Sequence, residues 1–492
     1  MELSDTFRQV TQSKSQTMKK FLILTLSLLL STGISAKVQL PALLQDNMVL
    51  QQQTEANLWG KTDPQKKVTV TTSWNKEKYT TQADENGAWK VAVSTPTAGG
   101  PYSITISDGE KVELNNVMIG EVWICSGQSN MQMPVAGFGG QPVTGSNDAI
   151  LGGAKDKNIR MFTVKREVSQ TPLDDCHTDT GWREASTQSI AEFSATGYFF
   201  GKNLYDVLNV PIGLIEADWG GTCIEAWMSE ESAQKVNPDQ TRDMQWGEAN
   251  QTARLFNAMI HPLINYTAKG FIWYQGESNL HMRTIPYYSQ FMQEMVSLWR
   301  NLWGDDTMPF YFVQIAPHQY WGTDQIDVPL IVEQQLDATD KIPYSGMAAT
   351  TDIGDKVCIH PSDKPTVGKR LALLALKETY KQGGIVAHSP RFKEARFENG
   401  KAYVTFTSDA TLGPDYTGRI LGFEIAGADK VFIPAHAEFV PGKQEIVVSS
   451  EIVAEPVAVR YAFRNVPKAA ELYNCGGLPA FPFRTDTWDD AR

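Results

Sequence analysis

The chain has 492 residues, of which 42% are hydrophobic and 20% are charged. This length exceeds what one hydrophobic core usually organises, so we expect two or three domains. The net charge of −12 and the sequence pI near 5.2 argue against a nucleic-acid-binding surface, which needs basic patches, and we expect no nucleic-acid partner.

The first residues are typical of a secretory signal peptide. Lys19 and Lys20 precede an apolar run over 21–30, and small residues follow as far as Ala36. We therefore expect a signal peptide over residues 1–36, with residues 1–17 an upstream start-site artefact because Met18 stands just before the lysines. The alternative is a membrane anchor, but the run is shorter than the roughly 20 residues of a spanning helix. We predict a secreted or periplasmic protein without stable membrane insertion of the mature chain.

The hydrophobic patterns divide the rest into three parts. Residues 37–116 contain short β-branched segments separated by turn signals such as Asp84-Glu85-Asn86-Gly87, which predicts a small β-sandwich-like module. Residues 117–385 alternate strands with helices, which predicts an α/β catalytic domain with a parallel sheet covered on both faces and an insertion around 162–192. Residues 386–492 return to a β-rich pattern. The predicted central strands are 122–125, 213–217, 271–274, 310–315 and 347–351, and the predicted helices are 194–208, 252–266, 286–303 and 364–382.

Candidate catalytic groups follow the central strands. Ligands of open α/β sheets bind at the carboxyl ends of the strands. Ser129 follows the first predicted strand in Ser126-Gly127-Gln128-Ser129-Asn130, and His360 follows the fifth in Ile359-His360-Pro361. Serine needs a base to become a nucleophile at neutral pH, and histidine, with an ordinary pKa of about 6.5, suits that role. A turn or helix-cap serine and a structural histidine are the plain alternatives. His261 and His318 are competing histidines.

Two further strand ends offer donors for an oxyanion. Gly221 lies in Trp219-Gly220-Gly221-Thr222 after the second strand, and Gln275 lies in Gln275-Gly276-Glu277-Ser278-Asn279 after the third. A backbone N–H in a glycine turn and a side-chain amide both stabilise the negative oxygen of an acyl-transfer intermediate. The N–H of Ser129 would complete this site. Tight turns and ordinary loop hydrogen bonds explain the same residues equally well.

The partner that would orient His360 stays open. Glu277, Asp352 and Asp355 are all candidates, and a surface or capping carboxylate is the alternative for each of them. The five cysteines contain no CxxC pair, and the chain has no HExxH motif, so the sequence indicates neither a metal nor another cofactor.

In this order the motifs resemble the SGNH-hydrolase superfamily, and more closely the sialate O-acetylesterase family. The resemblance runs from Asp46-Asn47-Met48-Val49-Leu50-Gln51 through Gly127-Gln128-Ser129-Asn130-Met131, Trp273-Tyr274-Gln275-Gly276-Glu277-Ser278-Asn279 and Ile359-His360-Pro361 to Phe483-Arg484-Thr485-Asp486. It implies a flavodoxin-like three-layer α/β/α core with N- and C-terminal β-sandwich-like modules and no metal. It also implies Ser129 as nucleophile, His360 as base, and Gly221 and Gln275 as oxyanion donors. Val357 stands where many superfamily members have an aspartate, so a triad that uses another carboxylate (Glu277, Asp352 or Asp355) and a Ser-His dyad both stay open.

The implied reaction is hydrolysis of O-acetyl esters on sialic acids, so the expected partner is an O-acetylated sugar or glycan. An acetylesterase acting on xylan or another polysaccharide would share the same motifs, because variable loops read the sugar. A non-catalytic glycan-binding protein is the alternative of another class. Aromatic residues that could stack on sugar rings are Trp219, Trp227, Tyr320 and Trp321, and Arg283 is a candidate partner for a sugar carboxylate.

Overall fold

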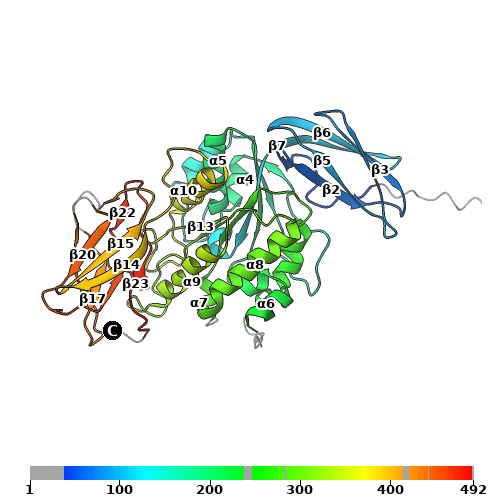
Figure 1. The fold of residues 1–492 in the computed structure, drawn as a ribbon. Coiled ribbons are helices and arrows are strands. Elements are labelled where there is room, and N and C mark those ends of the chain that lie inside the picture. Colours follow the sequence, from blue (N-terminus) through cyan, green and yellow to red (C-terminus); the bar gives the residue numbers. More distant parts are fainter. Residues whose placement is uncertain (1–37, 238–246, 282–283, 414–419, 441–442, 490–492) are drawn as a thin grey trace, which may run out of the picture.

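The computed structural model describes residues 38–237, 247–281, 284–413, 420–440 and 443–489. The expected signal peptide and Arg283 lie outside these residues. Figure 1 shows an α/β core between two β-rich modules, the N-terminal module in blue and the C-terminal module in orange and red. The fold is therefore mixed α/β with additional β-sheet modules, which agrees with the predicted class at this level.

A single long strand joins the N-terminal module to the core. Strand β7 (Lys111–Gly127) pairs antiparallel with β6 in its first half and parallel with core strands in its second half. The expected domain boundary at 116/117 therefore falls inside a continuous strand. The other strands of the module are β1 (Val49–Gln51), β2 (Glu55–Lys61), β3 (Lys67–Thr72), β4 (Lys78–Gln82), β5 (Ala88–Ser94) and β6 (Gly99–Ser107).

The central sheet has the strand order β13-β12-β11-β7-β10-β8-β9. All neighbours in this order are parallel except β8 and β9, which are antiparallel. The carboxyl ends of the parallel strands thus meet at one edge of the sheet. The bounds are β8 (Ile159–Thr163), β9 (Arg183–Glu184), β10 (Ile212–Asp218), β11 (Gly270–Tyr274), β12 (Phe310–Val313) and β13 (Ser345–Ala348).

Helices cover both faces of this sheet because its strands are apolar on both sides. In β11, Phe271 and Trp273 belong to one hydrophobic core and Ile272 and Tyr274 to the other. Helices α8 and α9 pack on the first face, and α5 and α10 on the second. The helices are α2 (Ser129–Gln132), α3 (Ser146–Gly153), α4 (Thr187–Glu192), α5 (Ala195–Leu208), α6 (Glu230–Val236), α7 (Glu277–His281), α8 (Tyr288–Trp303), α9 (Asp327–Lys341) and α10 (Lys364–Leu374), with short 3₁₀ and π turns at 224–227, 248–250, 256–263, 285–287 and 375–379.

The C-terminal module consists of antiparallel sheets around its own core. One sheet has the order β14-β15-β20-β19 and another β18-β17-β21-β23, with β16 and β22 paired beside them. Arg460 is fully buried there and pairs with Asp486 at 2.7 Å. The strands are β14 (Arg391–Glu398), β15 (Lys401–Thr407), β16 (Leu412–Gly413), β17 (Phe423–Ala426), β18 (Ile433–Pro434), β19 (His436–Phe439), β20 (Glu445–Ser449), β21 (Ala458–Tyr461), β22 (Tyr473–Asn474) and β23 (Phe483–Arg484).

All five predicted central strands are present, but the sequence pattern indicates neither strands β8 and β9 nor helix α9. Strand β8 runs into the start of the expected insertion, β9 lies within it, and α9 lies between the fourth and fifth predicted strands. The predicted helix over 252–266 is a π turn followed by a 3₁₀ turn. No helix in the described ranges is both long and apolar enough to cross a membrane.

Trp123 tests how far the core depends on β7. The indole is fully buried against Phe200 and Tyr311, and its N–H donates to the hydroxyl of Tyr380 at 2.9 Å. Trp123→Ala should lower the free energy of unfolding by about 3–5 kcal/mol because it leaves a cavity. Urea denaturation measures this loss. Leu151→Ala, at a side chain that is 72% exposed, should stay within about 0.5 kcal/mol of the wild type.

Candidate active site

Ser129 begins a short helix at the carboxyl end of the central strand β7. The turn before it needs glycine at position 127, where φ is +140° and a Cβ atom would lie 2.2 Å from the carbonyl oxygen of Tyr274. Because Ser129 is the first residue of α2, no carbonyl of a preceding helical turn accepts a hydrogen bond from its N–H. The side chain of Ser129 is half-buried at this edge of the sheet.

Asn130 fastens the serine turn to the histidine segment. Its Nδ2 donates to the carbonyl of Ile359 at 3.1 Å and to Oε1 of Glu277 at 2.5 Å. Its Oδ1 accepts from Nζ of Lys364 at 2.7 Å, and that ammonium also donates to the carbonyl of Pro361 at 2.8 Å. Asn130 and Lys364 are both fully buried. The segment of Ser129 is thereby tied to the segment of His360.

The ring of His360 is oriented by a carboxamide. Its Nδ1 lies 2.7 Å from Oε1 of Gln141, and Phe138 packs edge-on against the ring with centroids 5.2 Å apart. Because an amide oxygen only accepts, Nδ1 carries the proton in this contact and Nε2 is left as the basic nitrogen. Among the described residues, no hydrogen bond joins the His360 ring to Ser129.

The glycine turn after β10 lies against the serine. A Cβ atom on Gly220 would be 3.0 Å from the Cβ of Ser129, and the Gly220 N–H donates to Oε1 of Gln132 at 2.6 Å. Gly221 has φ +75° and open space where a side chain would point. Within the described part of the chain, the N–H groups of Ser129 and Gly221 have no protein acceptor. The serine thus has one unengaged N–H of its own and a second one in the adjacent glycine turn.

The side-chain amide of Gln275 does not join the unengaged N–H groups of Ser129 and Gly221. The side chain is fully buried, and its Nε2 lies within 3.1 Å of three acceptors, which are Oε1 of Gln128, the carbonyl of Thr222 and Oδ1 of Asn279. Its Oε1 accepts from the hydroxyl of Tyr288. The expected side-chain oxyanion donor is therefore engaged in a buried network, because every polar group of a buried amide needs a partner.

None of the three candidate carboxylates contacts His360. Glu277 is bound to Asn130, Asp352 forms a bidentate pair with Arg370 at 2.7 Å, and Asp355 caps its own loop by accepting from the N–H groups of Val357 and Cys358. The expectation that Glu277 or Asp355 orients the ring is thus corrected. No sequence signal marked Gln141, which lies 219 residues from the histidine it contacts.

The geometry agrees with comparisons to known proteins. A model of the family described as carbohydrate esterase, sialic acid-specific acetylesterase matches residues 119–377. The chain belongs to this family. It is 28% identical to the mouse and 29% identical to the human sialate O-acetylesterase, over 89% of this chain and more than 90% of each relative. A solved carbohydrate acetylesterase from Xanthomonas citri is 36% identical, with a TM-score of 0.84 over 92% of this chain and 100% of that one. The protein is therefore a carbohydrate esterase, and the glycan-binding alternative without catalysis is set aside.

Burial and charge control the titration of the esterase's site. Burial, with the nearby charges of Lys364 and His318, lowers the pKa of His360 to about 4. Burial also lowers the pKa of Lys364 to about 7, although Glu277 opposes this shift. Burial raises the pKa of Glu277. The imidazole of His360 is therefore neutral at physiological pH and available as a base.

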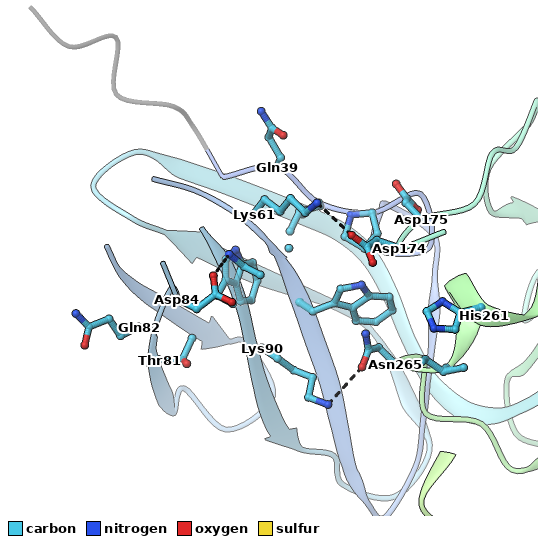
Figure 2. A pocket seen from close by; sticks show the side chains of 17 residues that line it. Gln39, Lys61, Thr81, Gln82, Asp84, Lys90, Asp174, Asp175, His261 and Asn265 are labelled. Atoms are coloured by element: carbon cyan, nitrogen blue, oxygen red, sulfur yellow. Dashed lines mark hydrogen bonds and ion pairs between the residues drawn. The ribbon is translucent and has the colours of Figure 1, made fainter. Parts of the chain in front are cut away.

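A separate cavity lies between the N-terminal module and the core (Figure 2). It has a volume of about 650 Å³ and is lined by strands β2 and β5 and by Asp174, His261 and Asn265. Lys61 reaches Asp174 and Lys90 reaches Asn265, each at 3.3 Å. Nδ1 of His261 lies 2.9 Å from the carbonyl of Leu173, to which it donates. The cavity contains none of the predicted catalytic residues.

No cluster of metal-binding side chains occurs among the described residues. Of the aromatic candidates for sugar contact, Trp227 is fully buried and donates to Thr222, so it serves packing. Trp219 is partly buried against the core. Trp321 is 57% exposed.

Asn130→Ala tests the connection between the two halves of the site. Removing the amide leaves Lys364 and Glu277 buried with fewer partners, so the free energy of unfolding should fall by about 2–4 kcal/mol. Turnover of a chromogenic acetate ester should fall as well, because the carbonyl of Ile359, next to His360, loses its hydrogen bond from Asn130. Denaturation and initial rates measure both effects. Asn203→Ala is the matched control. It removes one hydrogen bond, from the side-chain amide of Asn203 to the carbonyl of Phe199 on α5, and should leave the rate unchanged.

Proposed function

We propose that this esterase hydrolyses O-acetyl esters on sialic acids through an acetyl-serine intermediate. The observation that carries the proposal is that Ser129 has an unengaged N–H of its own and a second one in the adjacent glycine turn, while Asn130 ties the serine turn to the segment that carries the neutral imidazole of His360. Acyl transfer requires a nucleophile, a base and oxyanion donors in one place. The mammalian relatives named sialate O-acetylesterase support the choice of substrate.

The strand order supports an SGNH-type, flavodoxin-like core within the mixed fold. Numbered along the chain, β7, β10, β11, β12 and β13 have the spatial order 2-1-3-4-5. The order reverses between β7 and β11, and in such sheets the ligand binds outside the carboxyl ends at this reversal. Ser129 follows β7 and Gln275 follows β11 at that point. Strand β8 extends the edge beside β10.

In the proposed mechanism, His360 takes the proton of Ser129 as its oxygen attacks the acetyl carbonyl carbon. The N–H groups of Ser129 and Gly221 donate to the oxygen that becomes negative. The bond to the sugar oxygen then breaks, and that oxygen takes the proton from His360. Water, deprotonated by the same imidazole, attacks the acetyl-serine. The ester bond to Ser129 then breaks, the serine oxygen takes the proton from His360, and acetate leaves.

Gln128 supplies the third oxyanion donor in this proposal. Its Oε1 accepts from the N–H groups of Gly276 and Ser278 and from Nε2 of Gln275, which fixes the amide orientation. Its Nε2 has no acceptor within the described ranges. Because Gln128 directly precedes Ser129, this N–H group is free to donate to the oxyanion in the proposal. Gln275 acts as a positioning residue, because it holds Gln128 rather than the substrate.

We propose export after removal of residues 1–36.

The alternative substrate is another O-acetylated glycan such as xylan. The Xanthomonas relative is described only as a carbohydrate acetylesterase, so acetylated xylan is included as a second substrate in the activity test.

Acetate release decides between these substrates. The wild type should release acetate from 9-O-acetylated sialic acid faster than from acetylated xylan, and Ser129→Ala should abolish both reactions. Losing the nucleophile typically lowers kcat by about a millionfold. Activity of Ser129→Ala near the wild-type level would exclude the serine mechanism, while preference for xylan would replace only the substrate.

The pH profile tests the role of His360. A base with a pKa of about 4 stays neutral in mild acid. Because the rate requires the neutral form, kcat/KM for a chromogenic acetate should hold its plateau down to about pH 5.5. An ordinary histidine would lose about 90% of the rate there. An acid limb with a midpoint near 6.5 would contradict the proposal.

Gln141→Glu tests the orienting contact. A carboxylate placed 2.7 Å from Nδ1 favours the imidazolium, so the pKa of His360 should rise and the acid limb should move to higher pH. Gln141→Ala should instead lower kcat with little change in the midpoint. An unchanged profile in Gln141→Glu would remove Gln141 from this role.

A further inference from the structure

Trp321 is exposed although large aromatic side chains are normally buried. It is 57% exposed, whereas Trp123, Trp227, Trp273 and Trp299 are fully buried. The residue lies in the loop between β12 and α9, on the side of the core where the strands end. A single exposed apolar side chain is common on a protein surface, so the surroundings of Trp321 decide whether it marks a binding site.

Aromatic rings of the same loop and of α7 gather around Trp321. His318 lies 4.9 Å from Tyr320, and Tyr320 lies 5.9 Å from Trp321, measured between ring centroids. His281, at the end of α7, lies 5.2 Å from Trp321. We call these four side chains the aromatic wall. At its other end, His318 contacts the carbonyl of Asp355, which belongs to the segment that leads to His360.

The loop that carries Trp321 is fastened in a strained conformation. Tyr320 has φ +37°, which is unfavourable for a bulky residue and persists only where surrounding contacts impose it. On the catalytic side, the Gln319 N–H donates to the carbonyl of Lys356 at 3.3 Å, and Nδ1 of His318 lies 3.1 Å from the carbonyl of Asp355. The loop is thus tied to the segment that leads to His360.

The C-terminal module holds the other side of the loop. Asn465 is fully buried, accepts from the His318 N–H at its carbonyl and donates from Nδ2 to the carbonyl of Gly322 at 3.1 Å. Its Oδ1 caps the start of α9 by accepting from the Val328 N–H at 2.8 Å. The indole is therefore exposed on a preorganised backbone, and a ligand that stacks on it would pay little ordering entropy.

A cavity of about 840 Å³ opens beside the indole. It is lined by Trp321, His281 and the first turns of α9, and Arg484 forms its far wall. Both Glu333 and Asp489 already pair with Arg484, at 2.9 and 2.5 Å, so this guanidinium is not available for a ligand carboxylate. Asp327 adds a carboxylate whose Oδ2 accepts from Nδ2 of Asn465 at 3.3 Å and whose Oδ1 can accept a hydroxyl hydrogen. The volume fits a sugar ring, and the lining offers acceptors for its hydroxyl groups.

We propose that Trp321 is the platform on which a pyranose ring of the acetylated glycan stacks, with Asp327 facing its hydroxyl groups. The proposal rests on the proposed esterase function and identifies the subsite that holds the sugar while Ser129 attacks the acetyl group. It also gives the C-terminal module a role, which is to position this platform through Asn465. Trp321 contacts the sugar and takes no part in the bond-breaking steps.

Two substrates separate sugar recognition from chemistry. The chromogenic ester p-nitrophenyl acetate has no sugar, so Trp321→Ala should hydrolyse it at the wild-type rate. With 9-O-acetylated sialic acid or acetylated xylo-oligosaccharide, whichever the wild type prefers, Trp321→Ala should raise KM about tenfold with little change in kcat. Trp321→Phe, which keeps an aromatic ring, should recover most of this loss.

Tyr344→Ala is the matched control. Tyr344 is 60% exposed and precedes β13 at the opposite edge of the sheet, so its removal should leave both substrates unaffected. Equal loss on both substrates in Trp321→Ala would overturn the platform proposal, as would unchanged KM for the glycan. Ser129→Ala reports separately on the proposed function, because its failure to abolish hydrolysis of p-nitrophenyl acetate would remove the serine mechanism whatever Trp321 does.

A binding measurement removes turnover from the comparison. Calorimetry with the acetylated glycan and Ser129→Ala should detect binding that the double variant Ser129→Ala/Trp321→Ala weakens by about tenfold. Trp321→Ala could instead dissociate a dimer in sedimentation experiments and leave glycan binding intact. In that case the indole contacts a second copy of the chain, and the sugar proposal is wrong.

Discussion

The structure depends on one strand, β7, that is hydrogen-bonded in two sheets at once. Its first half belongs to the N-terminal module and its second half is the centre of the core. Its last residue, Gly127, passes so close to Tyr274 that only glycine fits, and this close approach sends the chain directly into Ser129. The position of the serine is thus set by backbone pairing on both sides of β7, which is among the least deformable arrangements that a protein has.

Around this strand the site is assembled from amides more than from charges. Asn130, Gln128, Gln141 and Gln275 each connect segments that are distant in the sequence. An amide both donates and accepts, so it can join a backbone carbonyl to a buried ammonium without adding net charge. The buried charges, Lys364 and Glu277, lie behind these amides and shift the pKa of the neighbouring groups. A neutral imidazole follows from this environment without any carboxylate on its ring.

Elements with strong periodicity were predictable, and contacts made by loops were not. The five central strands were recognised because both faces of each are apolar, which produces uninterrupted apolar runs. Helix α9 was missed because Pro329 and the polar residues around it weaken the helical pattern. Ser129 and His360 could be selected because they follow strands. The roles of Gln141 and Gln275 depend on hydrogen-bond partners across the fold, and residue spacing contains no information about those partners. The carboxylates near His360 in sequence pair instead with groups that the sequence does not place beside them.

The continuity of β7 affects how this architecture can be divided. A cut near residue 116, where composition changes, would sever a strand and leave β1, β6 and the rest of β7 with unpaired backbone groups. Exposed strand edges pair with other chains, so both fragments would tend to aggregate rather than fold separately. The N-terminal module is therefore no interchangeable appendage. Recombination within this family would preserve the sheet only where the exchanged segment includes the whole of β7 together with its partners.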